Sequence, residues 1–404
     1  MRITPLKIEN VKQAHKLLSE IRVSDEGIKI LSPKAISLAF KIEGITSWEA
    51  NVIKQHLLSL GSDSAIERAA LIKKIRTSTV MFGNISQLSK LCVKLKNQPF
   101  DLSEISHKLT VYLENFLKEE FVLYIRDTVL KIKKPLICGI INVTPDSFSG
   151  DGLFKTQNSK LKTKNLILEK VEKMMREGAK VIDIGGESTR PFSKPISEDE
   201  EIKRVIPAIK AIKKEFKNII VSVDTYKFKV AKHAAEAGAD IINDITALRK
   251  SPQIAGLIKR YRLGCVLMHM KGVPANMQIN PSYKDVTGQI VDFFSERINF
   301  CDKEGIDRRQ LLLDPGIGFG KNLEDNLRII NELYKFKIFG LPIFLGLSRK
   351  SFLGRITKQK PPQRILGTAV SNALAYLKGA HIFRVHDVKE TAQALKIASA
   401  IFYN

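Results

Sequence analysis

The sequence lacks long apolar runs, paired cysteines and an ordinary share of acidic side chains. A helix that crosses a membrane needs about 20 consecutive apolar residues, and the 404 residues contain no such run. The first residues lack the apolar centre of a signal peptide, and Glu9 and Glu20 are unusual for a transit peptide. We therefore expect a cytoplasmic protein that does not have a membrane as a partner.

The few cysteines are widely separated. Cys92, Cys138, Cys265 and Cys301 form no CxxC pair, so the sequence carries neither a zinc-binding pair nor a disulfide framework. Cys138 and Cys265 lie inside apolar runs that are typical of strands. We expect buried free thiols in a reducing compartment.

Acidic side chains are outnumbered, at 42 against 66 basic ones, which gives a formal net charge of +24. Such a charge is typical of nucleic-acid-binding proteins. However, residues 1–134 carry +8 and residues 135–404 carry +16, so the charge per residue is the same in both parts. Lysine supplies 47 of the 66 basic residues, whereas specific phosphate readers favour arginine. We therefore interpret most of the charge as solvated surface and expect no nucleic-acid partner.

A domain boundary is predicted at the charged cluster that ends in Pro135. Residues 1–134 form one predicted domain, a small mixed α/β extension of unknown role, and residues 135–404 form the other. In the extension, apolar spacing predicts helices at Pro33–Gly44, Trp48–Leu60, Ser86–Leu95 and Leu102–Leu117, and strands at Thr79–Phe82 and Phe121–Ile125.

After Pro135, short apolar runs alternate with helical stretches, a pattern typical of parallel β/α units. The runs are Leu136–Ile141, Lys180–Ile184, Ile219–Val223, Asp240–Ile242, Cys265–Met268, Leu311–Leu313, Ile343–Gly346 and His381–Val385. Eight units in a span of this size favour a (β/α)8 TIM barrel, which typically uses about 250 residues. The alternative is a doubly wound open sheet, which more often has fewer strands and a switch point.

Polar side chains stand at or near the end of each of the eight runs. They are Asn142, Asp183, Asp224, Asn243, His269, Asp314, the group Ser348-Arg349-Lys350, and Arg384 with His386. Active sites of TIM barrels lie at the carboxyl ends of the strands. Any one of these residues has a structural explanation as a strand cap, but the whole set predicts a site at one rim.

The acceptors Asp224, Asn243 and Asp314 suit a flat heterocycle with an amide–amidine edge, because its N–H groups need carboxylate partners. Lys350 could reach the ring carbonyl. The structural alternative is that these side chains cap the following helices, and it is strongest for Asp224.

Arginine and imidazole side chains predict an anion site on the last strand. Arg384 and His386 are two residues apart, so they face the same way on an extended strand. In a closed barrel that strand neighbours the first one, which ends at Asn142, and an amide oxygen suits Mg²⁺. These three residues predict a pyrophosphate site with a magnesium ion. Thr189 and Arg190, after the second strand, add donors for an anionic ligand.

The glycine-rich segment Asp314–Lys321 differs from a nucleotide-binding phosphate loop. Pro315 stands where that pattern needs its first glycine, and Asn322 follows the lysine in place of serine or threonine.

These motifs resemble the dihydropteroate synthase family, in its longer bacterial form with an N-terminal extension. The segments that carry the resemblance are Asn142–Phe148, Asp183–Pro191, Val223–Thr225, Ile242–Asp244, Asp314–Lys321, Ser348–Phe352 and Arg384–His386. The resemblance implies a (β/α)8 barrel that joins 4-aminobenzoate to 6-hydroxymethyl-7,8-dihydropterin pyrophosphate in folate biosynthesis. It also implies Mg²⁺ as a cofactor, competition by sulfonamides, and a homodimer.

The resemblance also implies a role for each matching residue. The pterin would contact Asp224, Asn243, Asp314 and Lys350, and the pyrophosphate and metal would contact Asn142, Arg384 and His386. The 4-aminobenzoate pocket would be lined by Phe148, Thr189, Arg190, Pro191, Phe319 and Ser351. Within this set, Asp224, Lys350, Arg384 and Asn142 are the expected catalytic residues, and Asn142 is the expected metal ligand.

The sequence departs from the family pattern in its first loop. Asp151 lies one position later than in many members, so its usual role is not assigned to it. The alternatives are a pterin-dependent corrinoid methyltransferase, which would not need the first loop or the Ser-Arg-Lys-Ser-Phe group, and a non-enzymatic binding protein.

Overall fold

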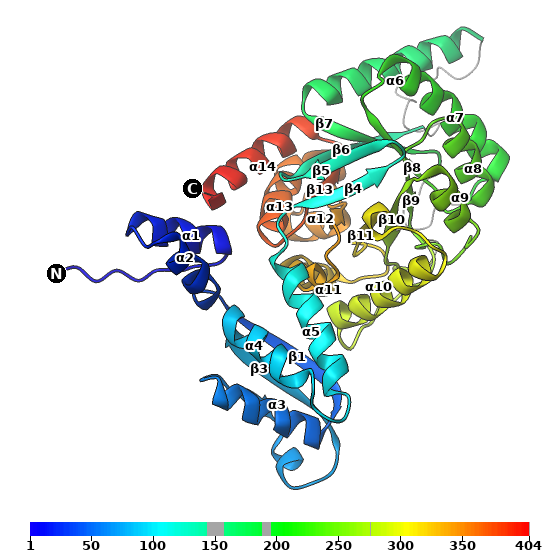
Figure 1. Ribbon diagram of the computed structural model, residues 1–404. Helices are drawn as coiled ribbons and strands as arrows, with labels where there is room; N and C mark the ends of the chain where they lie inside the picture. The colour runs from blue at the N-terminus through cyan, green and yellow to red at the C-terminus, as the bar shows by residue number, and fades with distance from the viewer. Residues whose placement is uncertain (144–156, 188–194, 275, 404) are drawn as a thin grey trace. The chain divides into compact units, whose positions relative to one another are not determined.

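The computed structural model describes residues 1–143, 157–187, 195–274 and 276–403. The chain forms two compact units. The first consists mainly of residues 1–118, with residues 338–340 and 403, and the second contains most of residues 119–402. Figure 1 draws the first unit in blue to cyan and the second in cyan to red.

The N-terminal unit is a three-stranded antiparallel sheet with helices. The sheet order is β1-β3-β2, with β1 at Ser37–Thr46, β2 at Ser64–Ile66 and β3 at Arg76–Asn84. The helices are α1 (Val11–Glu20), α2 (Asp25–Leu31), α3 (Ser47–Ser59), α4 (Ile85–Leu95) and α5 (Leu102–Leu117). Apolar side chains of α3, α4 and α5 form the core with those of the sheet. This is the small mixed α/β domain that the sequence predicts.

The predicted helix at Pro33–Gly44 is wrong, because most of this segment is strand β1. Its apolar residues Leu38, Phe40 and Ile42 alternate with exposed ones and pack against the core. That period of two fits a strand with one buried face. The segment pairs along its length with β3, and the long-range pairing decides its conformation.

Local capping defines where two of these helices begin. The Thr46 side chain accepts from the backbone of Glu49, whose carboxylate accepts in turn from Thr46, at the start of α3. Asn84 and Gln87 form the same capping box at the start of α4. Each box satisfies two backbone N–H groups that a helix start otherwise leaves free.

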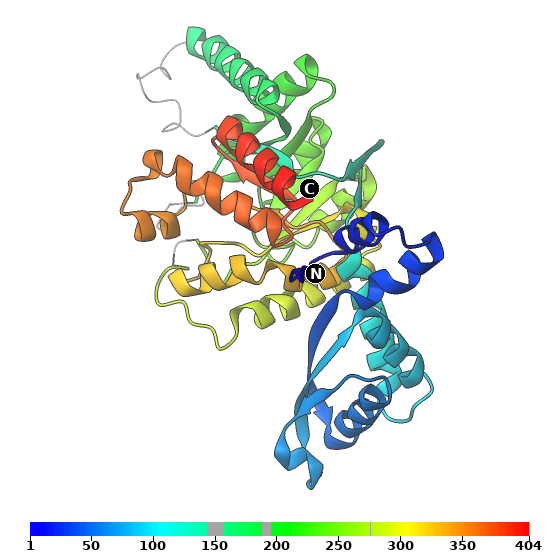
Figure 2. The same ribbon diagram turned by 90° about the vertical axis from the view of Figure 1, so that its left-hand side faces the viewer.

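The second unit is a barrel of eight parallel strands, as predicted (Figures 1 and 2). The strands are β6 (Leu136–Asn142), β7 (Ala179–Gly185), β8 (Ile220–Asp224), β9 (Ile241–Asp244), β10 (Gly264–Met268), β11 (Leu311–Asp314), β12 (Phe344–Leu345) and β13 (Ile382–Val385). Their order is β11-β10-β9-β8-β7-β6-β13-β12, and a bridge between Leu313 and Ile343 joins the two ends. The open doubly wound sheet is therefore excluded.

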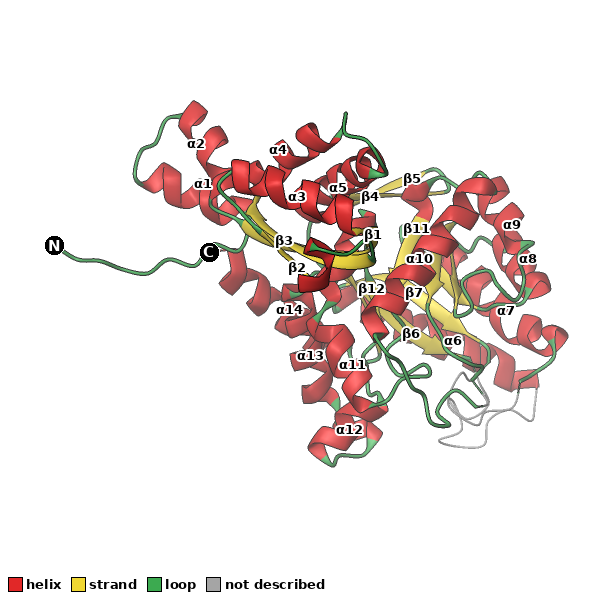
Figure 3. Cartoon of the chain, turned by 90° about the horizontal axis from the view of Figure 1, so that it is seen from below, coloured by secondary structure: helices red, strands yellow, loops and turns green. Residues whose placement is uncertain are grey.

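Helices surround the strands, as Figure 3 shows in red around yellow. They are α6 (Gln157–Arg176), α7 (Glu198–Glu215), α8 (Phe228–Glu236), α9 (Ile254–Tyr261), α10 (Val286–Lys303), α11 (Leu323–Asn331), α12 (Ser351–Thr357), α13 (Ile365–Leu377) and α14 (Val388–Tyr403). In the part of the chain that the structure describes, no helix combines the length and the apolar character that a membrane crossing requires.

A hairpin precedes the barrel and packs on its amino-terminal end. It consists of β4 (Phe121–Ile125) and β5 (Thr128–Ile132). Its buried residues Phe121, Leu123, Ile125 and Ile132 form one apolar cluster with residues of the barrel strands. The barrel residues in this cluster are Cys138, Val181, Ile241, Val266, Leu312, Phe344 and Ile382, which lie in the early part of their strands.

The hairpin places the division of the chain earlier than the predicted boundary at residues 134 and 135. The compact units divide after Lys118, so β4 and β5 belong with the barrel. Arg126, in the turn of the hairpin, strengthens this attachment, since its Nη2 donates to the carbonyls of Ala235 and Ala239, both at 2.6 Å. The charged cluster that ends in Pro135 connects the hairpin to the first barrel strand.

All four cysteines are buried free thiols, as predicted. Burial raises the pKa of Cys138 and of Cys265 well above the usual range. Such thiols pack as small apolar side chains and are poor nucleophiles.

Candidate active site

Polar residues line up at the carboxyl ends of four neighbouring barrel strands. The strand register pairs Asn142 with Gly185, Gly185 with Asp224, and Asp224 with Asn243. These residues therefore form one row across β6, β7, β8 and β9. Gly185 leaves room in this row, because a Cβ atom there would lie 3.3 Å from Oδ1 of Asn142.

Arg384 of β13 binds two carboxylates at this end of the barrel. Its Nε lies 2.5 Å from Oδ2 of Asp183, and its Nη2 lies 2.8 Å from Oδ2 of Asp224. The Asp183 side chain is fully buried and that of Asp224 is 10% exposed. The two carboxylates hold the pKa of Arg384 above its usual range, so the side chain is a permanent cation.

Asn243 joins the same group through Asp183. Its Nδ2 donates to Oδ2 of Asp183 at 3.3 Å. The Oδ1 atoms of Asp183 and Asn243 are buried and have no hydrogen-bond partner among the described residues. Buried acceptors of this kind are normally satisfied by protein, water or ligand, so a partner for these two atoms would come from a bound molecule, from water or from residues outside the described ranges.

Burial raises the pKa of Asp224 to about 7. Arg384 lowers this pKa and the neighbouring Asp183 raises it, and the loss of hydration is the largest effect. A carboxylate of this kind can bind a ligand N–H strongly, because it exchanges little hydration for the new bond.

Asp314 and Lys350 form a second pair of opposite charges at the rim. Burial raises the pKa of Asp314 above its usual range, although Lys350 opposes this. Burial also lowers the pKa of Lys350 to about 8. The Lys350 ammonium donates to the carbonyl of Ile317 and lies 4.8 Å from the ring centre of Phe319. It therefore connects the loop after β11 with the start of α12.

A buried lysine holds the loop that follows β11. Lys321 is 2% exposed. Its Nζ lies 2.9 Å from the carbonyl of Gly316, 3.0 Å from that of Phe319 and 3.0 Å from Nδ1 of His269. Burial, with help from Lys321, lowers the pKa of His269 to about 2, so this imidazole is neutral and can accept the bond. Lys321 thus ties the loop to the end of β10.

Two glycines let the same loop approach the end of β10 closely. Gly316 has a φ of +68°, and a Cβ atom there would lie 1.9 Å from the carbonyl oxygen of His269. A Cβ atom at Gly320 would lie 2.2 Å from the carbonyl oxygen of Lys271. The glycines of this segment therefore serve backbone packing and a left-handed turn. Lys321, the last residue of this segment, binds carbonyl groups of the same loop. This agrees with the prediction that the segment is not a nucleotide-binding phosphate loop.

The backbone N–H of Gly316 also fixes Asp314. It donates to Oδ1 of Asp314 at 2.7 Å. The turn that Gly316 makes therefore orients the carboxylate at the end of β11.

His386, after β13, is neutral and hydrogen-bonded. Its Nδ1 lies 3.0 Å from Oγ of Ser348, and burial with the nearby Arg384 and Arg349 lowers its pKa to about 3. Arg349 itself pairs with Asp387, with its Nε 2.9 Å from Oδ2 of that carboxylate. The imidazole can thus serve as a neutral hydrogen-bonding group, while the charge at this edge comes from arginine.

The structure brings some predicted site residues together and leaves others apart or outside. Asp224, Asn243 and Arg384 share one hydrogen-bonded group with Asp183. The charge of Lys350 acts on Asp314, and its ammonium lies over the ring of Phe319. Ser351 is exposed at the start of α12. Phe148, Thr189, Arg190, Pro191 and Asp151 lie outside the described residues.

Buried charges secure the chain on both sides of residues 188–194. Lys227 Nζ lies 2.5 Å from Oε2 of Glu187 and 2.7 Å from Oε2 of Glu201. Tyr226 donates to Glu187 at 2.8 Å, and the backbone N–H of Ile196 donates to the same carboxylate at 3.0 Å. This network holds Glu187 and the backbone of Ile196 in place.

Asp183, Lys321 and His269 have no individual site role among the sequence-based predictions. Asp183 and His269 were visible as strand-end residues, and Lys321 as the last residue of the glycine-rich segment. A lysine in an otherwise apolar and glycine-rich setting was the available signal for a buried amine, whose pKa burial lowers to about 7. The partners of these residues depend on the strand register, which the sequence alone does not define.

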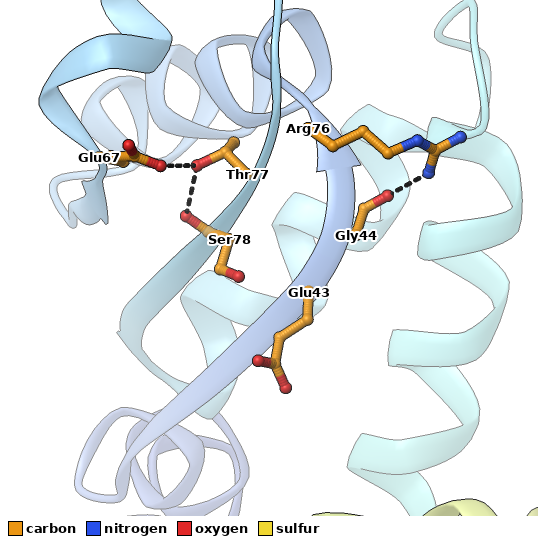
Figure 4. A pocket seen from close by; sticks show the side chains of 6 residues that line it. All are labelled: Glu43, Gly44, Glu67, Arg76, Thr77 and Ser78. Atoms are coloured by element: carbon orange, nitrogen blue, oxygen red, sulfur yellow. Dashed lines mark hydrogen bonds between the residues drawn. The ribbon is translucent and has the colours of Figure 1, made fainter.

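The N-terminal unit carries a shallow pocket lined by Glu43, Gly44, Glu67, Arg76, Thr77 and Ser78 (Figure 4). Arg76 donates to the carbonyl of Gly44 at 2.5 Å, and the Thr77 hydroxyl lies 3.3 Å from the Glu67 carboxylate. Because its polar groups bind one another, this pocket is not a candidate active site.

No group of three or more histidine, cysteine, aspartate or glutamate side chains in the described ranges could hold a metal ion.

Comparison with known proteins places the barrel in a family. The sequence matches the family described as pterin binding enzyme over residues 138–386. It is 42% identical over 278 residues to dihydropteroate synthase of Escherichia coli, covering 69% of this chain and 95% of that one. It is also 32% identical over 393 residues to a probable bifunctional folylpolyglutamate synthase/dihydropteroate synthase of Halobacterium salinarum, covering 97% of this chain and 46% of that one.

Solved structures agree with this assignment. Yersinia pestis dihydropteroate synthase in complex with a sulfonamide drug superposes with a TM-score of 0.64 at 41% identity, covering 70% of this chain and all of that one. Xanthomonas albilineans dihydropteroate synthase with 4-aminobenzoic acid gives a TM-score of 0.62 at 39% identity, covering 68% and 95%. The chain therefore belongs to the dihydropteroate synthase family, and its barrel carries that family's transferase activity in folate biosynthesis.

Proposed function

We propose that the barrel joins 4-aminobenzoate to 6-hydroxymethyl-7,8-dihydropterin pyrophosphate, giving 7,8-dihydropteroate and pyrophosphate. The observation that carries the proposal is the group in which Arg384 lies between Asp183 and Asp224, beside Asn243. It combines acceptors for a heterocycle with a cation for a leaving anion. The solved relative with bound 4-aminobenzoic acid supports the second substrate.

The pterin would bind to the buried acceptors. Asp224 and Asp314 would accept from ring N–H groups, and Asn243 would add an amide. Lys350, whose pKa is lowered to about 8, would donate to the ring carbonyl in its charged form. Each unmatched buried group would cost about 1–3 kcal/mol, which gives selectivity for this edge of the ring.

The pyrophosphate would bind to Arg384 and His386. Asn142 ends the neighbouring strand β6, on which Arg384 pairs with Cys138. Guanidinium groups match phosphate oxygens in pairs. The neutral His386 would contribute a hydrogen bond without adding charge.

Asn142, Arg384 and His386 could accommodate Mg²⁺ only as an ion that is bound largely by water and by the pyrophosphate. The chain would contribute the Asn142 amide oxygen, a hard ligand of the kind that Mg²⁺ accepts. When bound, the ion would neutralise charge on the leaving group.

The 4-aminobenzoate would lie on the outer side of the pterin. Phe148, Thr189, Arg190, Pro191, Phe319 and Ser351 are the proposed lining residues, and Arg190 would pair with the substrate carboxylate. Sulfonamides would compete for the same place, which makes the protein a proposed sulfonamide target.

The proposed reaction is a dissociative substitution. The bond between the pterin methylene carbon and the pyrophosphate oxygen breaks, and the electron pair leaves with pyrophosphate. Nearby carboxylates would stabilise the methylene cation. The neutral aniline nitrogen then attacks that carbon and loses one proton, so no strong base is needed.

A homodimer is also proposed, through helices α13 and α14. Apolar side chains at Leu366, Val370, Leu374 and Leu377 form one exposed stripe on α13, and Ile401 on α14 is 75% exposed. A contiguous exposed apolar stripe often marks an interface with another protein chain. Light scattering should give twice the chain mass, and Leu374→Glu should reduce it to the mass of one chain. If the wild-type protein has the mass of one chain, the dimer is excluded, and the apolar stripe on α13 would bind a different partner.

The test of the main proposal is a coupled assay on the purified protein in the reducing conditions of the cytoplasm, where we place the enzyme. With Mg²⁺ and both substrates at saturation, dihydropteroate should form, and a sulfonamide should inhibit competitively against 4-aminobenzoate. Absence of product would refute the proposal. Methyl transfer from a methylpterin to a corrinoid protein would favour the methyltransferase instead.

A further inference from the structure

Arg349 has a left-handed backbone at the point where the chain turns from β12 into α12. Its φ is +57°, and a residue other than glycine adopts this conformation only at a cost in free energy. Such residues persist where the surrounding structure holds them. Lys350 follows directly, and its ammonium donates to the carbonyl of Ile317 in the loop after β11. The backbone conformation of Arg349 therefore sets the path of the chain into Lys350.

Residues at the start of α13 bind both backbone polar groups of Arg349. The hydroxyl of Thr368 accepts from the N–H of Arg349 at 3.1 Å, and Nη1 of Arg364 donates to the carbonyl of Arg349 at 2.9 Å. The same hydroxyl donates to the carbonyl of Arg364 at 2.8 Å, which fixes its orientation. Because Thr368 is fully buried, an apolar side chain at this position would leave the Arg349 N–H facing a methyl group.

The Arg364 guanidinium extends this attachment to both ends of α12. Its Nη1 also lies 3.2 Å from the carbonyl of Lys350, and its Nε donates to the carbonyl of Gln359 at 2.9 Å. Lys350 precedes α12, and Gln359 follows its end. The helix leaves room for the guanidinium at Gly354, where a Cβ atom would lie 2.1 Å from Nη2 of Arg364. The short helix and the turn before it are thus fixed to the start of α13.

The Arg349 side chain binds a different element. Its Nε lies 2.9 Å from Oδ2 of Asp387, which follows β13. Several rotatable bonds separate this guanidinium from the backbone, so the ion pair constrains the side chain more than it constrains φ. The hydrogen bonds to Thr368 and Arg364 act on the peptide groups directly. The two sets of contacts can therefore be tested separately.

We propose that Thr368 is a positioning residue for the transferase reaction, because its hydroxyl holds Arg349 in the left-handed conformation that directs Lys350 to the loop after β11. The inference rests on the proposed function, which places Lys350 on the pterin. Thr368 acts through the backbone and is not placed on either substrate.

Two substitutions at position 368 separate the hydroxyl from the packing of the side chain. Thr368→Val removes the hydroxyl and keeps the shape, whereas Thr368→Ser keeps the hydroxyl. We expect Thr368→Val to lower the kcat/KM for the pterin pyrophosphate by about tenfold, the order expected when a hydrogen bond is lost and its donor is left unpaired. Thr368→Ser should retain most of the activity. Equal losses in both variants would overturn the proposal, since packing would then be responsible.

Thr391→Val is the matched control. Thr391 is also fully buried, in α14, and its hydroxyl has no hydrogen-bond partner among the described residues. We expect this variant to leave the kcat/KM unchanged and to leave the thermal unfolding temperature unchanged or raised. A loss of kcat/KM equal to that in Thr368→Val would assign the effect to an additional buried methyl group and overturn the proposal.

A comparison of Arg349→Gly with Arg349→Ala tests the role of the backbone conformation. Both variants lose the side chain that pairs with Asp387, but only alanine retains the cost of a left-handed backbone. Adding Thr368→Val should therefore lower the kcat/KM by a larger factor in Arg349→Ala than in Arg349→Gly. The same factor in both would overturn the proposal, because Thr368 would then act on something other than φ of residue 349.

A measurement without substrates keeps the inference separate from the proposed function. Burial lowers the pKa of Lys350 to about 8, so its acetylation by acetic anhydride, followed by peptide mass spectrometry, should have its midpoint near that pH. In Thr368→Val the ammonium should become more hydrated, and the midpoint should move toward the usual value of about 10.4. An unchanged midpoint would overturn the inference. A shifted midpoint together with a wild type that forms no dihydropteroate would refute the proposed function alone.

Discussion

Asp224 and Lys350 have pKa values displaced toward one another by burial. The pKa of Asp224 is raised to about 7, and that of Lys350 is lowered to about 8. The proposed pterin contacts need the ionised carboxylate and the charged ammonium at the same time. The ionised form of Asp224 is lost as the pH falls through about 7, and the charged form of Lys350 is lost as the pH rises through about 8.

Pterin affinity should therefore be greatest between about pH 7 and pH 8. Further outside this range the affinity should fall by up to about tenfold per pH unit on each side, since one proton is gained or lost. Calorimetric titration with 6-hydroxymethylpterin at a series of pH values measures this dependence of the affinity on pH. In Lys350→Gln the decline on the alkaline side should disappear. An alkaline decline that persists in this variant would mean that another group is responsible.

At the residue scale, the types of the site residues were predictable from the sequence and their partners were not. Asp224, Asn243, Asp314 and Arg384 were recognisable because each ends an apolar run. The bond from Arg384 to Asp183 joins residues 201 positions apart. It depends on strand register and side-chain direction, so Arg384 was expected beside Asn142 and was not expected to bind the two carboxylates.

The loop after β11 is the element that positions Asp314 and Lys350 in the site. Its close approach to β10 requires a glycine at position 316, where φ is +68° and a Cβ atom would lie 1.9 Å from a backbone oxygen. Gly316→Ala should therefore destabilise the protein by more than the roughly 1–2 kcal/mol that a left-handed alanine costs. It should also weaken pterin binding, because the Gly316 N–H orients Asp314.

Gly256→Ala is the matched control for this prediction. Gly256 lies within α9, and a Cβ atom there would meet no heavy atom within 4 Å. Alanine at such a helical position is expected to be stabilising by about 0.5–1 kcal/mol. Chemical denaturation of both variants measures the difference. Equal stabilities would mean that the loop can move away from His269 at little cost.

The β4–β5 hairpin decides where a truncated protein that contains only the barrel should begin. A protein that starts at Glu119 keeps Phe121, Leu123, Ile125 and Ile132 in the apolar cluster under the barrel, whereas one that starts at Pro135 loses all four. We expect the longer form to fold and to bind pterin, and the shorter form to aggregate. Near-ultraviolet circular dichroism and pterin titration of both forms measure this. Equal pterin binding by the two forms would show that the hairpin is dispensable.

Strands of the barrel were predictable because each is a short apolar run that ends in a polar residue. All eight predicted runs coincide with strands, although bounds differ by a residue or two. The segment Pro33–Gly44 was assigned wrongly because its apolar residues fit both a helical and an alternating spacing, and pairing with β3 decides between them. Helices α1 and α2 were not predicted.

The whole molecule carries a net charge of +24, spread evenly along the chain. A surface with this excess should attract the anionic pterin pyrophosphate, and salt screens such attraction over about 10 Å at 0.1 M. We therefore expect the kcat/KM for this substrate to fall as ionic strength rises from 0.01 to 0.3 M, with kcat nearly constant. A kcat/KM that is independent of salt would leave the excess charge as solvated surface without an effect on substrate capture.

Pairing of β6 with β13 has a consequence for the order in which the protein folds during synthesis. The N-terminal sheet pairs strands that are close in the sequence, so it can form as soon as residues 1–118 have left the ribosome. The first barrel strand must wait for its neighbour β13, which emerges roughly 240 residues later, or roughly 10–50 s at about 5–20 residues per second. During this interval β6 has an unpaired edge, and we expect nascent chains that stop before β13 to be the forms most dependent on chaperones.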